Sequence, residues 1–377
     1  KMIETPKPAT IKKGIDIELN IESLAYGGMG LARENNFVIF VKGAIPGQRV
    51  LARVYKKKSG FAEARVLKVL IESKKAVDTK CNHFYICSKI QSLSYDEQII
   101  EKSNQVEDIF NRLGGILDFK VDYKVPAKKI FNYRNKMEFT FSPHRWVLET
   151  EPEDVEKNFA LGLHMTGRYD KILDIENCHI QPSIGNKILK VAREVCKSNL
   201  DLKPYDPKTH IGFLRYLMIR FGVNTNQIMV NIVTSYNDLN KLSPLIDMLL
   251  KEIPEITSMV NNVNTRKSDV SFGEYETLVF GKPYIEEKIG DLTFEISANS
   301  FFQTNTYQGQ KLYQEVEKAA NLTGDEVIFD LYCGTGTIGL YLAKKAKEVY
   351  GFEVIRSSLE DAEKNAEKNN VENIFFL

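Results

Sequence analysis

The stretch that decides the fold is EVIFDLYCGTGTIG, residues 326–339. An apolar run that ends in an acid is followed by Gly334-x-Gly336-x-x-Gly339, and this pattern predicts a β-strand, a tight glycine turn and the start of a helix. The next predicted strand, VYGFE, ends in Glu353, fourteen residues after Gly339. An acid in that place can accept two hydrogen bonds from a ribose diol. The pattern therefore predicts that an adenosine-containing cofactor binds near the C-terminus.

Two classes of cofactor bind to such a strand, turn and helix: the nicotinamide dinucleotides and S-adenosylmethionine. Asp330 ends the first strand four residues before the first glycine. Its charge suits a cofactor with an amino group and a sulfonium, and it would repel a pyrophosphate. The residues therefore favour S-adenosylmethionine. A turn that serves packing alone is the other alternative, but the capping box Ser357-x-x-Glu360 after Glu353 indicates a complete βαβ unit.

This βαβ unit is one part of a doubly wound sheet. A sheet of this class needs about five or more strands. Strands are expected at 326–331 and 348–353, and NIFFL at 373–377 begins a third. The α/β domain, which begins at residue 286, is therefore expected to be incomplete at Leu377.

The N-terminal residues differ in pattern and charge. Residues 1–75 contain 15 Lys and Arg against 7 Asp and Glu, whereas the remainder contains 36 against 43. Short alternating runs, which begin with Ile15 and Ile17 and are separated by glycine-rich turns, predict an OB-like β-barrel over residues 1–71. A basic module on an acidic body favours nucleic-acid binding, and a merely solvated surface is the alternative.

A mixed α+β region lies between these two modules, at residues 72–285. The apolar spacing is helical from 95 to 115, where two glycines end the pattern. YLMIRFGV at 216–223 and QIMVNIVT at 227–234 predict a hairpin. The fold class is thus a multidomain α+β and α/β protein: a barrel, a mixed central domain and a Rossmann-like domain.

Composition favours a cytoplasmic protein. At 377 residues, two or three domains are expected. No apolar run approaches the roughly 18–20 residues that a membrane helix needs, and the N-terminus lacks the apolar middle of a secretory signal. The five cysteines are odd in number and widely spread, which does not suggest a disulfide framework.

With these motifs in view, the chain resembles the RNA uracil-C5 methyltransferases, which form 5-methyluridine in ribosomal or transfer RNA. The stretches that carry the resemblance are IESLAYGGMGLAR (21–33), NYRNKMEF (132–139), LRYLMIR (214–220), SANSFFQTN (297–305), DLYCGTGTIGL (330–340) and EVIRSSLEDAEKNAEKNNVENIFF (353–376). The resemblance implies a TRAM-type RNA-binding barrel at 1–71 and a central RNA-binding domain at 72–285. Residues 286–377 would be the N-terminal part of an S-adenosylmethionine-dependent methyltransferase domain, on which a helix at 94–125 would pack.

The resemblance also implies which residues bind. The expected S-adenosylmethionine contacts are Gln303, Tyr332, Gly334, Gly336, Thr337 and Glu353, which Asp330 joins through its charge. Candidate RNA contacts are Lys56, Lys57, Lys58, Arg134, Lys136, Arg215 and Arg220. Surface solvation or strand-edge ion pairs are the alternatives for these cations. The expected partner is an unpaired RNA loop, in 23S ribosomal RNA rather than transfer RNA, bound by a monomer without membrane contact.

The chemistry of the resembled family is covalent. A cysteine thiolate adds to uracil C6, C5 takes the methyl group, and a base removes the C5 proton before the cysteine leaves. In the family both residues lie downstream of the region that ends at Leu377, and Cys333 inside the cofactor turn reads as a small buried residue. The chain is therefore expected to be truncated at its C-terminus and to lack its catalytic centre. A non-catalytic RNA-binding remnant is the alternative, with a dinucleotide-dependent oxidoreductase as a distant third.

The cysteines depart from the resembled family. That family commonly holds a four-iron cluster with C-x5-C-x2-C and a distant fourth cysteine. Cys81 and Cys87 fit the first spacing and Cys178 the distant one, but Ser88 falls where the third cysteine belongs. Three thiolates hold such a cluster poorly. We therefore expect no intact iron–sulfur cluster, and zinc bound with His83 is an alternative.

Overall fold

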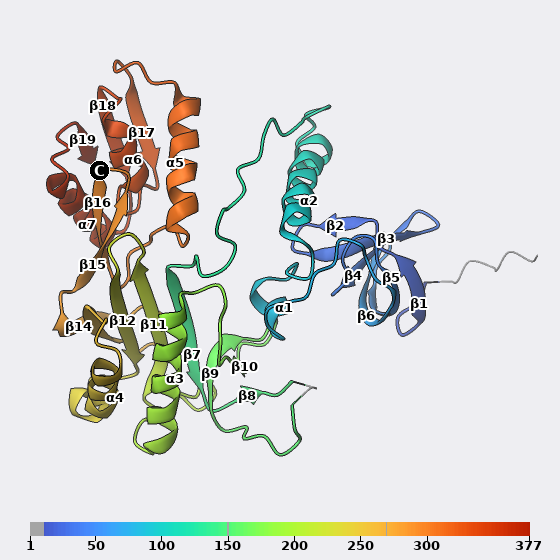
Figure 1. The fold of residues 1–377 in the computed structure, drawn as a ribbon, viewed down its shortest axis with the longest axis horizontal. Coiled ribbons are helices and arrows are strands. Elements are labelled where there is room, and N and C mark those ends of the chain that lie inside the picture. Colours follow the sequence, from blue (N-terminus) through green and yellow to red (C-terminus); the bar gives the residue numbers. More distant parts are fainter. Residues whose placement is uncertain (1–10, 149–150, 269) are drawn as a thin grey trace, which may run out of the picture. The chain divides into compact units, whose positions relative to one another are not determined.

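The computed structural model describes residues 11–148, 151–268 and 270–377, and the chain divides into two compact units (Figure 1). The first unit ends at Pro126, and the second runs from Ala127 to Leu377. The first ten residues of the expected barrel module lie outside the described residues. The finer domain boundaries expected after residues 71 and 285 stay predictions.

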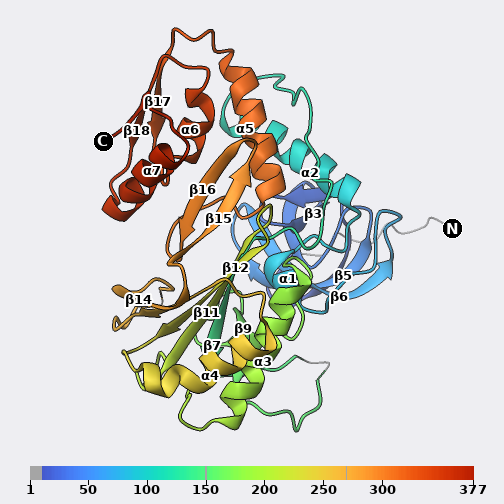
Figure 2. The same cartoon turned by 60° about the vertical axis from the view of Figure 1, so that its left-hand side comes forward.

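A six-stranded, strongly curved sheet forms the core of the first unit (Figure 2). Its strands are β1 (Asp16–Asn20), β2 (Ser23–Ala25), β3 (Met29–Glu34), β4 (Phe37–Lys42), β5 (Arg49–Lys57) and β6 (Phe61–Ile71), in the order β1-β5-β6-β4-β3-β2. Ile17 and Leu19 are buried and the residues between and beside them are exposed, so the predicted period of two is confirmed. The buried side chains, with Ile39 and Val50 at the centre, fill a single core. The expected OB-like barrel is thus present.

A helical segment follows the barrel. It consists of α1 (Phe84–Cys87), α2 (Tyr95–Asp108) and one π-helical turn, η1 (Ile109–Leu113). The buried carboxylate of Glu101 accepts the backbone N–H of Leu24 at 3.1 Å, which fixes α2 to β2. Residues 114–125 are not helical, so the helix expected over 94–125 is too long. Its packing on the C-terminal domain stays a prediction.

An eight-stranded sheet is the centre of the second unit. Its strands are β7 (Lys136–Ser142), β8 (Arg145–Trp146), β9 (Ala160–His164), β10 (Ile172–Asp174), β11 (Leu214–Gly222), β12 (Gln227–Thr234), β13 (Ser258–Val263) and β14 (Tyr275–Gly281), in the order β14-β13-β12-β11-β7-β9-β10-β8. β11 and β12 form the predicted hairpin. β11 lies between β12 and β7, and all nine of its residues are buried.

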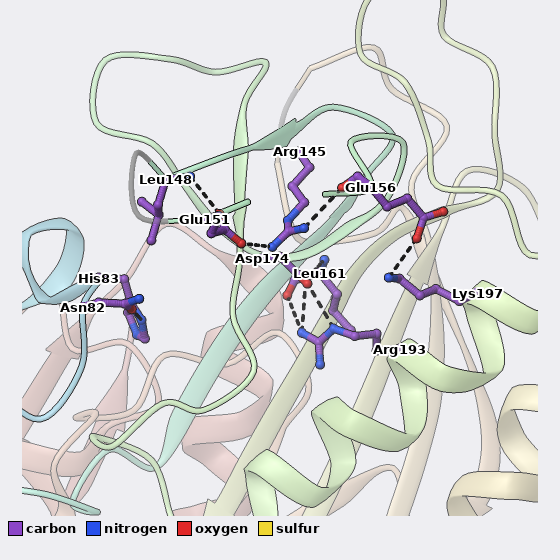
Figure 3. A network of polar contacts seen from close by, with 10 residues as sticks. All are labelled: Asn82, His83, Arg145, Leu148, Glu151, Glu156, Leu161, Asp174, Arg193 and Lys197. Atoms are coloured by element: carbon purple, nitrogen blue, oxygen red, sulfur yellow. Dashed lines mark hydrogen bonds and ion pairs between the residues drawn. The ribbon is translucent and has the colours of Figure 1, made fainter. Parts of the chain in front are cut away.

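Two helices, α3 (Ser183–Ser198) and α4 (Leu239–Glu252), pack against each other and lie across one face of this sheet (Figure 2). Arg193 of α3 donates to the carbonyl oxygen of Leu161 and pairs with Asp174 at 3.1 Å (Figure 3). It also donates to the carbonyl oxygen of Ile175. These contacts fix α3 to β9 and β10. No helix in the described part of the chain is long and apolar enough to cross a membrane.

The C-terminal part begins with an antiparallel hairpin and continues with alternating strands and helices. The elements are β15 (Tyr284–Ile289), β16 (Leu292–Ser297), α5 (Thr306–Ala320), β17 (Val327–Leu331), α6 (Thr337–Ala343), β18 (Glu348–Phe352), α7 (Arg356–Lys368) and β19 (Ile374–Phe376). β17, β18 and β19 are parallel and adjacent in that order, as the βαβ pattern predicted. One apolar core joins Met229 and Val260 of the central sheet to Phe294 of β16 and Val349 of β18.

The start of α7 corrects one local prediction. The residue before the helix is Ile355, and no side chain caps it, so Ser357 lies inside the first turn. Glu360 pairs with Arg356 at 3.2 Å. The N–H groups of Val354 and Ile355, which precede the helix, donate instead to the side chain of Glu353.

Candidate cofactor site

The turn between β17 and α6 is built from left-handed backbone. Tyr332, Gly334 and Gly336 have φ angles of 61°, 56° and 74°. A Cβ on Gly336 would lie 2.9 Å from the ring of Phe376, so a larger residue does not fit there. Unlike glycine, Tyr332 has a Cβ that disfavours a positive φ angle, and the residue is 86% exposed. A strained, exposed aromatic residue beside a glycine turn is a feature of ligand sites.

Glu353 joins this turn to the end of β18. Its Oε2 accepts the N–H of Gly334 at 3.1 Å, and its Oε1 accepts those of Val354 and Ile355 at 2.8 and 2.9 Å. A carboxylate has about four lone-pair sites, so these three donors leave capacity for a further hydroxyl. The acid is held by the backbone in the place where the sequence predicts a ribose.

Asp330 fixes the first turn of α6. Its Oδ2 accepts the N–H of Gly339 at 2.9 Å. A Cβ on Gly339 would lie only 3.0 Å from the same oxygen, so the third glycine lets the helix approach the carboxylate. Burial raises the pKa of Asp330 above its usual value, and the hydrogen bond from Gly339 offsets part of that rise. A direct contact between Asp330 and a cofactor stays a prediction.

The loop after β16 lies against the glycine turn. The hydroxyl of Thr335 donates to the carbonyl oxygen of Phe301 at 3.4 Å. Gln303 follows in the same loop, and its carbonyl oxygen accepts from Asn135 at 2.8 Å. The hydroxyl of Thr337 lies 2.9 Å from that of Tyr313 in α5. These contacts hold the loop of Gln303 and the start of α6 near the glycine turn, and the cofactor contacts themselves stay predictions.

Arg220, a predicted RNA contact, is hydrogen-bonded to the loop after β16. It is 4% exposed, and its guanidinium donates to the carbonyl oxygens of Ala298, at 3.2 Å, and Ser300. Burial lowers its pKa to about 10, while the carboxylates of Glu138 and Asp361 oppose that shift. The side chain positions the loop rather than facing solvent.

Arg215 of the same strand is also buried. It is 3% exposed and donates to the carbonyl oxygens of Asn264, Arg266 and Ser268 at 2.9, 2.5 and 2.7 Å. Its guanidinium also lies 4.4 Å from the centre of the Tyr205 ring. Because both guanidinium groups are buried and donate to backbone carbonyls, Arg215 and Arg220 have structural roles here, and their predicted RNA contacts stay predictions.

The basic run at the end of β5 contains three lysines in different surroundings. The Nζ of Lys56 lies 2.5 Å from Oε1 of Glu63. That of Lys57 lies 5.6 Å from the centre of the Phe37 ring. Lys58 is exposed just beyond the strand. All three stay predicted RNA contacts.

Arg134 and Lys136 lie at the start of β7. The Nε of Arg134 donates to the carbonyl oxygen of Lys136 at 2.9 Å. The Nζ of Lys136 lies 2.5 Å from Glu138, and burial lowers the pKa of Lys136. Both residues stay predicted RNA contacts.

Asp361, which the sequence did not single out, supports the loop from α7. Its Oδ2 accepts the hydroxyls of Ser297 and Ser300 at 3.0 and 2.5 Å. The two serines belong to the quoted SANSFFQTN stretch, but their partner lies about 60 residues along the chain. No local pattern signals such a pair.

Glu287 is a second buried carboxylate that the sequence did not single out. It is fully buried and accepts the N–H groups of Val223 and Asn224 at 2.7 and 2.9 Å. It also accepts the hydroxyl of Thr306 at 2.8 Å. Glu287 thereby joins the turn after β11 to the start of α5, directly after the loop that contains Gln303.

The cysteines that match part of the family's cluster motif lie in both units. Cys81 and Cys87 are near α1, half-buried and exposed, and Cys178 is buried in the second unit. Within residues 11–148, 151–268 and 270–377, no group of three or more His, Cys, Asp or Glu side chains could hold a metal ion. With Ser88 in the third position, the donor set does not fit a four-iron cluster. The absence of a cluster stays a prediction.

A glycine turn between a strand and a helix, with an acid at the end of the next strand, defines a nucleotide-binding site of the Rossmann-like class. Family models agree with the two ends of the chain: that of the tRNA (uracil-5-)-methyltransferases matches residues 255–377, and that of the TRAM domain matches residues 12–67. An RNA methyltransferase of Chlorobaculum tepidum, described as uncharacterized, is 39% identical over 97% of this chain and 77% of that protein. A similar protein of Halalkalibacterium halodurans is 35% identical over 98% of this chain and 78% of its own.

Among solved structures, the tRNA (uracil-54, C5)-methyltransferase of Pyrococcus abyssi, in complex with S-adenosyl-L-homocysteine, matches with a TM-score of 0.72. It is 29% identical, over 96% of this chain and 79% of that one. The chain belongs to the family of RNA (uracil-5-)-methyltransferases. The expected TRAM barrel and methyltransferase fold are confirmed, whereas the expected truncation at Leu377 finds no support in these matches.

Proposed function

We propose that this chain binds S-adenosylmethionine at the turn after β17 and directs its methyl group to C5 of a uridine in RNA. The observation that carries the proposal is the carboxylate of Glu353, held by three backbone N–H groups beside the left-handed turn of Gly334 and Gly336. The relative from Pyrococcus abyssi binds S-adenosyl-L-homocysteine, which supports the choice of cofactor.

The residues of the turn fit this cofactor. Glu353 would accept a hydroxyl of the ribose, and the glycines let the backbone approach without a clash. Asp330 would add a negative charge near the amino acid and sulfonium. When bound, the cofactor supplies an electrophilic methyl group. The side chains of this site bind and orient it, and they take no part in activating the uracil.

Activation of the uracil needs a thiolate and a base, and we propose the family's covalent route through C6. Cys333 does not suit the role of nucleophile. Burial and the nearby carboxylates of Asp330 and Glu353 raise its pKa to about 11, so the thiolate is scarce at neutral pH. Neither the nucleophile nor the base is therefore assigned to a residue of the cofactor turn. A protein that binds cofactor and RNA without transfer is the alternative.

The RNA substrate is 23S ribosomal RNA or transfer RNA. The sequence favours ribosomal RNA because of the N-terminal barrel. However, the transfer-RNA enzyme of Pyrococcus abyssi matches 96% of this chain, so the barrel does not separate the two. A cytoplasmic location and a monomeric state stay predictions.

The test is methyl transfer from labelled S-adenosylmethionine to two unmodified transcripts, 23S ribosomal RNA and a transfer RNA pool. Digestion to nucleosides and mass spectrometry should find 5-methyluridine in one of them. Methylation of another base, or of protein alone, would contradict the proposal. Binding of S-adenosyl-L-homocysteine and RNA with no transfer would support the alternative of a non-catalytic RNA-binding protein.

A further inference from the structure

A cavity of about 510 Å³ lies at one edge of the central sheet. β12 and β13 are parallel and end at Thr234 and Val263, and β11 begins beside them at Leu214. The segments that adjoin these strand ends form the walls, and none of the lining residues belongs to the cofactor turn. A volume between about 300 and 1,000 Å³ is typical of sites that bind small molecules.

The walls of the cavity are basic. Lys203, Lys241, Lys267 and His210 contribute to them, and none of the eleven described lining residues is acidic. Lys203, Lys267 and His210 are exposed, and Lys241 is half-buried. A basic wall of this kind attracts a polyanion such as the backbone of a nucleic acid.

The acids beside the cavity already have partners. Glu274 accepts the hydroxyl of Thr265 at 2.5 Å and pairs with Arg266. Asp206 accepts the backbone N–H of Lys208 at 2.9 Å and pairs with His144 at 3.0 Å. Neither carboxylate lines the cavity, so the charges on its walls are those of the lysines.

The same walls carry aromatic rings. Tyr236 is 43% exposed, and its ring centroid lies 4.8 Å from that of the buried Phe213. The ammonium of Lys241 lies 5.2 and 5.6 Å from the centres of these two rings, and 2.9 Å from the hydroxyl of Tyr236. A partly exposed ring, held by a second ring and a cation, is a platform on which a nucleobase can stack.

We propose that this cavity binds one unpaired nucleotide of the substrate RNA, with its base on Tyr236 and its phosphates beside Lys203 and Lys267. This inference rests on the proposed function, which supplies RNA as the ligand. From Phe213, the residue before β11, to Arg220 within it, the chain advances seven residues, or about 23 Å. Arg220 holds the loop at the cofactor end, so the bound nucleotide is not the methylated one. At about 3.4 Å per stacked nucleotide, it lies roughly seven nucleotides away.

The test uses the full chain and a fluorescein-labelled twelve-residue oligouridylate, titrated by anisotropy between 50 and 200 mM salt. Tyr236→Ala should weaken binding by about fivefold or more, whereas Tyr236→Phe should stay within about twofold of the wild type. Lys203→Gln with Lys267→Gln should lower the slope of log affinity against log salt by about 1.4, since each lost contact with a single strand removes about 0.7. The matched control is Lys190→Gln with Lys251→Gln, two exposed lysines of α3 and α4.

Three results would overturn the inference. One is wild-type affinity and slope in the Tyr236→Ala and Lys203/Lys267 variants. The second is an equal loss in the control pair. The third is an equal loss for Tyr236→Ala on an abasic oligonucleotide of the same length, which would exclude base stacking. Binding of S-adenosyl-L-homocysteine, measured by calorimetry, should be unchanged in every variant. A wild-type protein that binds this ligand but no RNA would instead contradict the proposed function, and the inference with it.

Discussion

At the scale of single residues, the carboxylate of Glu353 makes three hydrogen bonds with the backbone at the cofactor turn. Both of its oxygens accept backbone N–H groups, from Gly334 on one side and from Val354 and Ile355 on the other. In Glu353→Gln an NH₂ donor replaces one acceptor and faces an N–H, so one of these bonds is lost at a cost of about 1–3 kcal/mol. We expect calorimetry to show an affinity for S-adenosyl-L-homocysteine reduced about tenfold or more. Glu348→Gln, at the start of the same strand, is the control, and equal affinities in the two variants would contradict the assigned role.

Asp330 makes the stability of the turn depend on pH. Its folded-state pKa is raised above the usual 3.8, mainly by burial. The stability that Asp330 contributes is therefore fully present below the usual pKa of 3.8, and it is lost as the pH rises through the raised pKa of the folded state. Asp330→Asn removes this loss, so the variant should gain stability relative to the wild type between pH 4 and pH 7. It should also bind S-adenosyl-L-homocysteine more weakly, because the charge is gone.

Glu326, one residue before the same strand, provides a control of opposite sign. Hydrogen bonds from Thr323 lower its pKa to about 2, so its contribution is present above the usual value and is lost as the pH falls. Urea unfolding of Glu326→Gln should show a deficit at pH 7 that shrinks towards pH 4. If the two variants changed in the same direction with pH, the assignment of either shift would be wrong.

At the scale of elements, β11 supports two loops of the second unit through two arginines. Arg220 donates to the loop that precedes α5, and Arg215 to the segment 264–268 after β13. Arg220→Lys keeps the charge but loses the fork of donors, at a cost of about 1–3 kcal/mol. We expect hydrogen exchange to speed up in residues 297–305 and not in 264–268. Arg215→Lys should give the reverse pattern, and faster exchange in both segments from either variant would contradict separate roles.

These two arginines also show what the sequence could not predict. The strand, turn and helix at 326–343 were predicted correctly because glycine spacing and apolar periodicity are local properties of the chain. The partners of Arg215 and Arg220 lie some 50 to 80 residues away, so nothing near them distinguishes a buried guanidinium from a solvated one. Asp361 and Glu287 were missed for the same reason. The helix over 94–125, which the resemblance implied, was too long, whereas the helical apolar spacing from 95 to 115 ends close to the observed end at Leu113.

At the scale of the whole molecule, the excess of positive charge and the cofactor turn belong to different units. Residues 1–75 contain 15 basic against 7 acidic side chains, and most of them belong to the barrel. The turn and every predicted cofactor residue lie in the second unit. RNA affinity and cofactor affinity should therefore respond to separate sets of substitutions.

The basic run of the barrel allows this separation to be tested with neighbouring residues. Lys56 is paired with Glu63 at 2.5 Å, whereas Lys58 extends beyond the strand into solvent, so Lys58 is the better placed to meet a phosphate. Lys58→Gln should lower the slope of log affinity against log salt by about 0.7 for a single-stranded RNA, and Lys56→Gln should lower it by less, because the ammonium of Lys56 is already paired with Glu63. Neither substitution should change the affinity for S-adenosyl-L-homocysteine. Equal slopes in the two variants and the wild type would remove this run from the RNA-binding surface, and a loss of cofactor affinity in either variant would show that the two units are coupled.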